Sequence, residues 1–201
     1  MNDRETSNER PRGRLVVISG PSGAGKTSVC RELKRDPRVV FSVSATTRPP
    51  REGEVDGVDY RFLTPDEFAA ADAAGEFLEH ATYNGNRYGT LRDQVDEALA
   101  AGRVFVLEIE VQGTRQLRES QIDACYVFVV PPSLEELERR LVSRRQNTQA
   151  EIAARMKIAA DELSAQHLYD HVIVNESLPD TVRQVRQVIG LDVDHAPTTH
   201  G

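Results

Sequence analysis

The sequence predicts an α/β fold in which a parallel β-sheet is flanked by helices. Short apolar segments recur along the chain with the near-continuous hydrophobicity of strands that are buried on both faces. These segments are residues 15–19, 104–109, 125–130 and 172–174. The stretches between them have helical periodicity, which is the alternation expected of β-α-β units. The first apolar segment continues directly into a glycine-rich loop and a helical pattern, which predicts a P-loop at the start of the sheet.

Composition narrows the class of protein. The 201-residue chain is long enough for one compact domain with small subdomains. Its net charge of -7 argues against a general nucleic-acid-binding protein, because such proteins need a broad basic surface. No apolar segment approaches the ~20 residues of a membrane-spanning helix. Residues 1–13 and 192–201 are polar and predict disordered tails, the first without the apolar core of a signal peptide. We therefore expect a cytoplasmic protein with no nucleic-acid or membrane partner.

The loop after the first strand has the GxxxxGK[ST] spacing of a P-loop. Its glycines let the backbone turn so that successive N–H groups point at one phosphate, and the dipole of the following helix adds to the attraction. Lys26 is expected to bridge the β- and γ-phosphates of a nucleoside triphosphate, and the Thr27 hydroxyl to reach Mg²⁺. The residues of this loop predicted to bind the triphosphate are Gly20, Pro21, Ser22, Gly23, Ala24, Gly25, Lys26, Thr27 and Ser28.

Residues 39–101 predict a small inserted α+β subdomain. The segment is rich in Thr, Arg, Gly, Pro and Tyr, and the alternation in FSVSATT and VDYRFL predicts short, half-buried strands. Arg48 and Arg51 flank two prolines, and the first proline keeps Arg48 out of helical backbone. Two guanidinium groups there could bind a second phosphate, with Tyr60 and Tyr88 as further donors. For the two arginines considered alone, a solvated loop is the alternative.

A helix is expected to begin near Leu134. Two prolines end the preceding strand, and Ser133 is the predicted N-cap with Glu136 three residues later. Leu134, Leu137 and Leu141 then form an apolar stripe along one face of this helix.

Arginines lie beside the apolar faces of this helix and of the next. Arg140 and Arg144 are one turn apart and flank the leucine stripe, whereas Arg139 points almost the opposite way. Arg155 borders the later apolar face, made of Ile152, Met156, Ala159 and Leu163. Phosphoryl transfer needs positive charge around the transferring group, which such arginines could supply. A solvated helix face is the alternative for each arginine alone.

Taken together, these motifs resemble the guanylate kinases, which transfer the γ-phosphoryl group of ATP to GMP. The resemblance runs from about Arg14 to the helix after Pro179. It rests on GPSGAGKT, SVSATTRPPREGEVDGVDY, GEFLEHATYNGNRYGT, LEIEVQG, RRLVSRR and VIVN, in this order. It implies a P-loop kinase core, a small inserted GMP-binding α+β subdomain and a helical lid. The substrates implied are ATP and GMP, with Mg²⁺ as cofactor, whereas the oligomeric state stays undecided.

The resemblance also implies roles for individual residues. Those expected to bind the GMP phosphate are Arg48, Arg51, Tyr60 and Tyr88. Those expected to contact guanine are Ser44, Glu79 and Thr90, with Glu110 near the guanine edge or the arginines. A carboxylate at position 79 suits the N1 and N2 donors of guanine, whereas adenine would place an acceptor against it. The expected catalytic residues are Lys26, Arg48, Arg140, Arg144 and Arg155.

Further implications concern the donor nucleotide and the domain boundaries. Thr27 and Glu108 are expected near Mg²⁺, mostly through water, and Asn175 near the adenine of ATP. The implied guanylate kinase-like domain covers residues 14–191. Within it, the core is expected at about 14–38, 102–133 and 165–191, the GMP-binding insert at about 39–101 and the lid at about 134–164.

Some positions depart from the usual family pattern. Glu108 and Glu110 stand where the family usually has aspartates, so each carboxylate reaches one methylene further. Arg145 stands where a glycine is common, and Asn147 where an acidic residue is common. Loss of that glycine is expected to stiffen the hinge of the lid. The reaction class is expected to be unchanged, with slower closure or product release.

Two other functions compete with this interpretation. A noncatalytic guanylate-kinase-like binding module predicts a degraded P-loop and missing lid arginines, whereas this chain has both. A related sugar-phosphate kinase, acting for example on ribose 1,5-bisphosphate, has no use for residues that recognise guanine. Those residues favour the nucleotide, and they are Ser44, Glu79, Tyr88 and Thr90.

Overall fold

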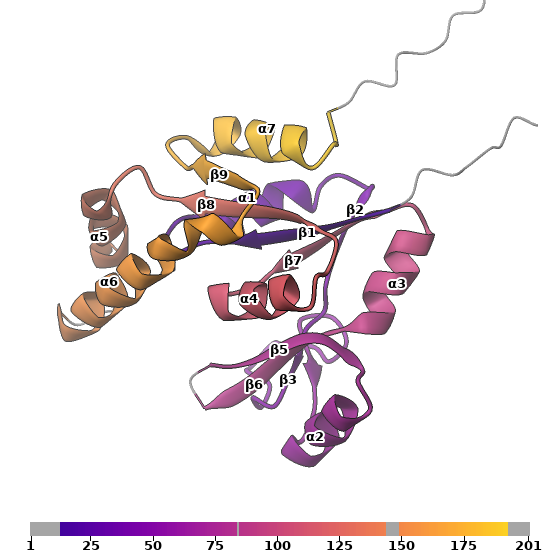
Figure 1. The fold of residues 1–201 in the computed structure, drawn as a ribbon. Helices are drawn as coiled ribbons and strands as arrows, with labels where there is room; N and C mark the ends of the chain where they lie inside the picture. The colour runs from indigo at the N-terminus through magenta and orange to yellow at the C-terminus, as the bar shows by residue number, and fades with distance from the viewer. Residues whose placement is uncertain (1–12, 84, 144–148, 193–201) are drawn as a thin grey trace, which may run out of the picture. The chain divides into compact units, whose positions relative to one another are not determined.

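The computed structural model describes residues 13–83, 85–143 and 149–192 (Figure 1). Two compact units divide the chain. Among the described residues, unit 1 comprises residues 13–15 and 38–106, and unit 2 comprises residues 16–37 and those from 107 to 192.

The larger sheet has the strand order β2-β7-β1-β8-β9. Its strands are β1 (Arg14–Ser19), β2 (Val39–Phe41), β7 (Val104–Glu108), β8 (Cys125–Val130) and β9 (His171–Val174). Strand β8 pairs in parallel with both β1 and β9, and β2 pairs in parallel with β7. Val16, Val17 and Ile18 of β1 have no exposed surface, as expected for a strand covered on both faces. The predicted α/β fold with a parallel sheet flanked by helices is confirmed.

Helices of unit 2 connect and cover its strands. They are α1 (Lys26–Leu33), α4 (Val111–Glu119), α5 (Leu134–Ser143), α6 (Gln149–Leu163), the 3₁₀ helix η1 (Ser164–Leu168) and α7 (Leu178–Val188). Helix α1 packs against α7, which also contacts β9, whereas α4 lies on the other side of the sheet and contacts η1 (Figure 1). Helices α5 and α6 pack together around Leu137, Leu141 and Ala159. Both lie in the segment predicted as the lid.

Unit 1 contains a second, smaller sheet with the order β4-β3-β6-β5. Its strands are β3 (Ala45–Thr46), β4 (Arg61–Phe62), β5 (Phe77–Tyr83) and β6 (Asn86–Leu91). The same unit contains the helices α2 (Pro65–Ala73) and α3 (Arg92–Ala100). A small core supports this sheet, in which the rings of Phe68 and Phe77 stack with centroids 4.3 Å apart. Helix α2 begins with a capping box, because the hydroxyl of Thr64 accepts from the N–H of Glu67 and the Glu67 carboxylate accepts from the N–H of Thr64. The predicted α+β character of this segment is therefore seen.

Val39–Phe41, which the sequence placed at the start of the insert, belongs to unit 1 and pairs with β7 in the larger sheet. An expectation from the sequence about α5 is wrong in detail. Leu134 is 42% exposed, whereas Leu137 and Leu141 are fully buried, so the apolar stripe of α5 begins one turn later than expected. The predicted cap is present, since the Glu136 N–H donates to the Ser133 hydroxyl at 3.1 Å.

The sequence predicts no membrane-spanning helix. Among the helices of the described residues, none has both the length and the apolar character to cross a bilayer.

Candidate functional site

The loop between β1 and α1 has the backbone of a phosphate-binding loop. Gly20 and Gly25 have φ angles of 148° and 99°, in the region that L side chains rarely adopt. A Cβ atom on Gly20 would lie 2.0 Å from the carbonyl oxygen of Val129, and one on Gly25 would lie 2.2 Å from Nδ2 of Asn175. Both positions therefore require glycine for conformation and for space. The loop packs this closely because strand β8 and the end of β9 lie directly behind it.

A pocket opens in front of this loop, lined by Pro21, Ser22, Gly23, Gly25, Lys26, Thr27, Ser28, Glu108 and Glu110. The ammonium group of Lys26 donates to the carbonyl oxygens of Gly20 and, at 3.3 Å, of Pro21. The amine is thus held over the pocket by two neutral acceptors of its own loop. A phosphate group in the pocket would offer it a charged acceptor instead, which forms a stronger hydrogen bond.

Two oxygen ligands suited to Mg²⁺ meet at the edge of the same pocket. The Thr27 hydroxyl donates to Oε1 of Glu108 at 3.1 Å, although the two residues are far apart in sequence. Beneath them, burial raises the pKa of the Cys30 thiol, so this cysteine is a neutral part of the core. One hydroxyl and one carboxylate fit Mg²⁺, which prefers oxygen ligands and keeps several of its waters.

A second carboxylate of the pocket, Glu110, has a partner that the sequence did not identify. Glu162, near the end of α6, lies beside Glu110 and the backbone N–H of Ser22, and both affect its pKa. Burial and the neighbouring Glu110 charge raise the pKa of Glu162 to about 7, and Lys26 acts in the opposite direction. Its Oε2 atom is buried and has no hydrogen-bond partner among the described residues. The sequence signal was weak, namely an acidic residue beside the apolar face of α6.

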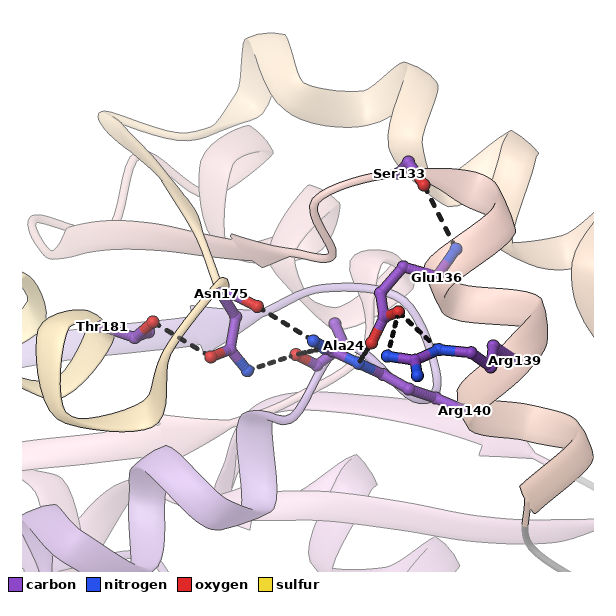
Figure 2. A network of polar contacts seen from close by, with 7 residues as sticks. All are labelled: Ala24, Ser133, Glu136, Arg139, Arg140, Asn175 and Thr181. Carbon is purple, nitrogen blue, oxygen red and sulfur yellow. Dashed lines mark hydrogen bonds and ion pairs between the residues drawn. The ribbon is translucent and has the colours of Figure 1, made fainter.

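The predicted adenine contact, Asn175, lies at the end of β9 and is only 7% exposed. Its Nδ2 donates to the carbonyl of Ala24 at 2.7 Å, and its Oδ1 accepts from the Thr181 hydroxyl at 3.0 Å (Figure 2). Its side chain is therefore directed at the P-loop on one side and at α7 on the other. Thr181 is a further residue that the sequence did not identify. The contact between Asn175 and Ala24 spans too much of the chain for a sequence pattern to reveal it.

Arg140 joins this network from α5 (Figure 2). Its Nη2 donates to the carbonyl of Asn175 at 3.1 Å, and its Nη1 lies 3.5 Å from the carbonyl of Ala24. Its Nε donates to Glu136 at 2.8 Å, and this pairing together with Arg139 lowers the pKa of Glu136. Arg139 is 78% exposed at its side chain, as expected for the arginine on the opposite face.

The other predicted lid arginine in the described part of the chain is Arg155, which is half-buried on α6. Arg144, and the departures at Arg145 and Asn147, lie outside the described residues.

In unit 1 the predicted phosphate-binding arginine Arg48 is paired with Glu54. Nη2 of Arg48 donates to Oε1 of Glu54 at 2.8 Å, and Oε2 accepts from the backbone N–H of Arg51 at 2.7 Å. The pairing with Arg48 lowers the pKa of the Glu54 carboxyl. Glu54 therefore fixes both arginines of the loop relative to each other. Glu54 lies within the segment SVSATTRPPREGEVDGVDY, from which the phosphate site was predicted. Its contact with the arginines depends on a turn that the composition of this segment does not predict.

Aromatic residues surround the same guanidinium. The Cζ of Arg48 lies 5.3 Å from the ring centroid of Tyr60, and the rings of Tyr60 and Tyr88 meet edge to face at 6.1 Å. The hydrogen bond with Glu54, and to a smaller extent the interaction with Tyr88, raises the pKa of Arg48. Arg51 is exposed. Unit 1 thus brings Arg48, Tyr60 and Tyr88 together, whereas Arg51 is linked to them through its backbone N–H on Glu54.

The residues predicted to contact guanine also form a group in unit 1. The Thr90 hydroxyl donates to Oε1 of Glu79 at 2.7 Å, and the two residues are cross-strand neighbours on β6 and β5. Glu79 is 6% exposed, and this burial raises the pKa of its carboxyl. Extending the β3–β6 register by one residue places Ser44 opposite Thr90. A buried carboxylate, a hydroxyl and a serine in one row suit a planar polar ligand.

Comparisons with known proteins identify the family. The family model described as guanylate kinase matches residues 12–191. The chain belongs to the guanylate kinase family. A guanylate kinase from Bifidobacterium longum is 49% identical over 183 residues, covering 88% of this chain and 93% of that protein. A guanylate kinase from Synechococcus sp. is 48% identical over 179 residues, covering 89% and 82% respectively.

Comparison with solved structures gives the same family. The crystal structure of guanylate kinase from Anaplasma phagocytophilum has a TM-score of 0.72 and 34% identity, and covers 90% of this chain and 86% of that one. The structure of TT1252 from Thermus thermophilus shares the fold, with a TM-score of 0.51 and 17% identity. Membership of the guanylate kinase family makes the chain a nucleoside monophosphate kinase, a phosphotransferase.

Proposed function

We propose that the chain transfers the γ-phosphoryl group of ATP to GMP, and to dGMP, giving ADP and the nucleoside diphosphate. This reaction recycles GMP and supplies GTP. The observation that carries the proposal is that both required sites are built from side chains already in contact. Unit 2 has a complete P-loop pocket with Thr27 bonded to Glu108, and unit 1 has the buried Glu79–Thr90 pair.

In the proposed reaction, an oxygen of the GMP phosphate attacks the γ-phosphorus of ATP. The bond from that phosphorus to the β–γ bridging oxygen breaks, and ADP leaves with the electron pair. The transition state carries its charge on the transferring oxygens, so catalysis depends on positioning and on positive charge. Lys26 lies within its own loop where it can turn from carbonyl acceptors to these oxygens. Arg140, Arg144 and Arg155 are proposed to add charge from the α5–α6 segment.

The metal proposal follows from the ligands present. Mg²⁺ would be held by Thr27, and by Glu108 mostly through water, and would neutralise charge on the β- and γ-phosphates. The one-methylene-longer Glu108 already reaches the Thr27 hydroxyl, so this departure is compatible with the site.

Guanine selectivity is assigned to Ser44, Glu79 and Thr90, which lie in one row across the smaller sheet of unit 1. Glu79 is proposed to accept from N1 and N2 of guanine, with Ser44 and Thr90 completing the polar contacts. Arg48, Arg51, Tyr60 and Tyr88 are proposed to bind the GMP phosphate. Glu110 was predicted near the guanine edge or the arginines, and that prediction stays open. In unit 2 this residue lines the P-loop pocket and lies beside Glu162, whose pKa it raises. A cytoplasmic location likewise stays a prediction.

The proposal is tested by ADP release from ATP and Mg²⁺ with GMP, dGMP, AMP or ribose 1,5-bisphosphate as acceptor. Strong release with GMP and dGMP and little with AMP is expected. Turnover only with the sugar phosphate would favour the sugar-phosphate kinase, and turnover with none of them would favour a binding module.

A further inference from the structure

A buried amide holds one carbonyl group of the P-loop. Nδ2 of Asn175 donates to the carbonyl oxygen of Ala24 at 2.7 Å, and the side chain occupies the space above the Cα of Gly25. The contact joins residues 151 positions apart, at the end of β9 and in the loop after β1. It is therefore a tertiary clamp on the loop and not part of the local turn.

The orientation of this amide is determined by its neighbours. A carbonyl oxygen can only accept, so the Asn175 nitrogen must face Ala24 and the Asn175 oxygen must face α7. There the Thr181 hydroxyl lies 3.0 Å from Oδ1, and 2.8 Å from the carbonyl of Ser177 one turn earlier in α7. Thr181 has no exposed surface, so its single proton serves these two acceptors without water. Thr181 thus holds the oxygen of the Asn175 amide while the nitrogen of this amide holds the Ala24 carbonyl.

The clamp has a consequence for phosphate binding. In a trans peptide the carbonyl and the following N–H point in opposite directions, so fixing the carbonyl of Ala24 also fixes the N–H of Gly25. The carbonyl points to Asn175, and hence the N–H points away from it. P-loops bind phosphate through such N–H groups. Arg140 also lies 3.5 Å from the Ala24 carbonyl and donates to the Asn175 carbonyl (Figure 2). The position of its guanidinium group therefore depends on the position of the Ala24–Gly25 peptide.

We propose that Asn175 and Thr181 are positioning residues of the P-loop, which orient the Ala24–Gly25 peptide for the triphosphate whatever base the donor carries. The inference rests on the proposed function only in taking the P-loop as the triphosphate site. It differs from the expectation that Asn175 acts at the adenine. Substituting a residue that contacts adenine lowers the affinity only for ligands that carry the base. Substituting a residue that orients the loop lowers the affinity for every triphosphate.

The test uses inorganic tripolyphosphate with Mg²⁺, which has no base. Its affinity, and that of ATP, is measured by calorimetric titration into the wild type, Asn175→Ala, Thr181→Val and Thr181→Ser. Asn175→Ala is expected to weaken both ligands about tenfold or more, and Thr181→Val to weaken both by roughly 3–10-fold, since each leaves a buried polar group unpaired. Thr181→Ser keeps the hydroxyl and is expected to restore binding.

Two results would overturn the proposal. One is that Asn175→Ala weakens ATP but not tripolyphosphate, which would assign Asn175 to the base. The other is that Thr181→Val binds tripolyphosphate as the wild type does. Thermal unfolding is followed for each variant, and Thr181→Val carries the test if Asn175→Ala does not fold. The titrations contain no GMP, so absence of GMP phosphorylation with these affinities as expected would contradict the proposed function alone.

Discussion

In unit 2 the cation of the predicted donor site, Lys26, lies against backbone carbonyls, whereas in unit 1 the cation of the predicted acceptor site, Arg48, lies against the carboxylate of Glu54. The difference concerns what an incoming phosphate must replace. Carbonyls are neutral and give up an ammonium group readily to a charged acceptor. A carboxylate competes with phosphate on equal terms. Arg48 can satisfy both only because a guanidinium group has five N–H donors.

The comparison extends to how each site recognises its ligand. The donor loop is held by buried neutral hydrogen bonds around Ala24, which act on the backbone. The acceptor row depends on a buried charge at Glu79, whose carboxyl has a raised pKa because of burial. The first arrangement suits a triphosphate of any base, and the second suits one base in particular. Variants in the two sites should therefore have separable effects.

The largest effect is expected for Lys26→Ala. Because the ammonium group acts on the charge of the transferring phosphoryl, turnover should fall by more than ~10²-fold while the KM for GMP changes little. Steady-state kinetics with a thermal unfolding control measures this. Lys157→Ala on α6 is a matched control, since Lys157 is exposed. Near-normal turnover of Lys26→Ala would refute the role of Lys26.

A smaller and more selective effect is expected for Glu79→Gln. The amide turns a donor toward the donors of guanine, so the KM for GMP should rise by roughly 10–100-fold and the KM for ATP much less. Glu76→Gln, an exposed neighbour just before β5, is the control. Equal changes in both KM values would make Glu79 a structural residue.

A moderate effect is expected for Glu54→Gln. The pairing that orders Arg48 and the Arg51 backbone would weaken, so the KM for GMP should rise by about 3–10-fold with turnover nearly unchanged. Glu52→Gln in the same loop is exposed and serves as the control. A lowered KM would mean instead that Glu54 mainly competes with the phosphate.

The smallest effect is a pH dependence that Glu79 should produce. Its folded pKa is raised above the ordinary 4.5, so the folded protein binds this proton more tightly than the unfolded chain does. This contribution to the free energy of unfolding therefore increases as pH falls through the raised pKa toward 4.5. GMP affinity should change in the opposite sense, because guanine needs the carboxylate. Chemical unfolding and GMP titration across this range would test both, with Glu79→Gln expected to remove the two trends.

Sequence reasoning predicted the parts of the molecule that depend on local pattern. The strands β1, β7 and β8, the P-loop and the cap at Ser133 each follow from neighbouring residues. The expected burial of Leu134, and of Val172 and Val174 in β9, was wrong because the surrounding elements decide which side chains are covered. Thr181, Glu162 and Glu54 were not identified because their roles depend on partners that only the folded chain brings into contact. The resemblance to a family supplied Ser44, Glu79 and Thr90, and no pattern alone would have done so.

The function proposed for this chain requires a guanine-specific acceptor site that is separate from its triphosphate site. Calorimetric titration of GMP, without ATP, into the wild type, Lys26→Ala and Glu79→Gln tests it most directly. We predict that Lys26→Ala binds GMP as the wild type does and that Glu79→Gln loses most of its affinity. Loss of GMP binding in Lys26→Ala, with Glu79→Gln unaffected, would show that the two sites are not separate and that Glu79 does not recognise guanine.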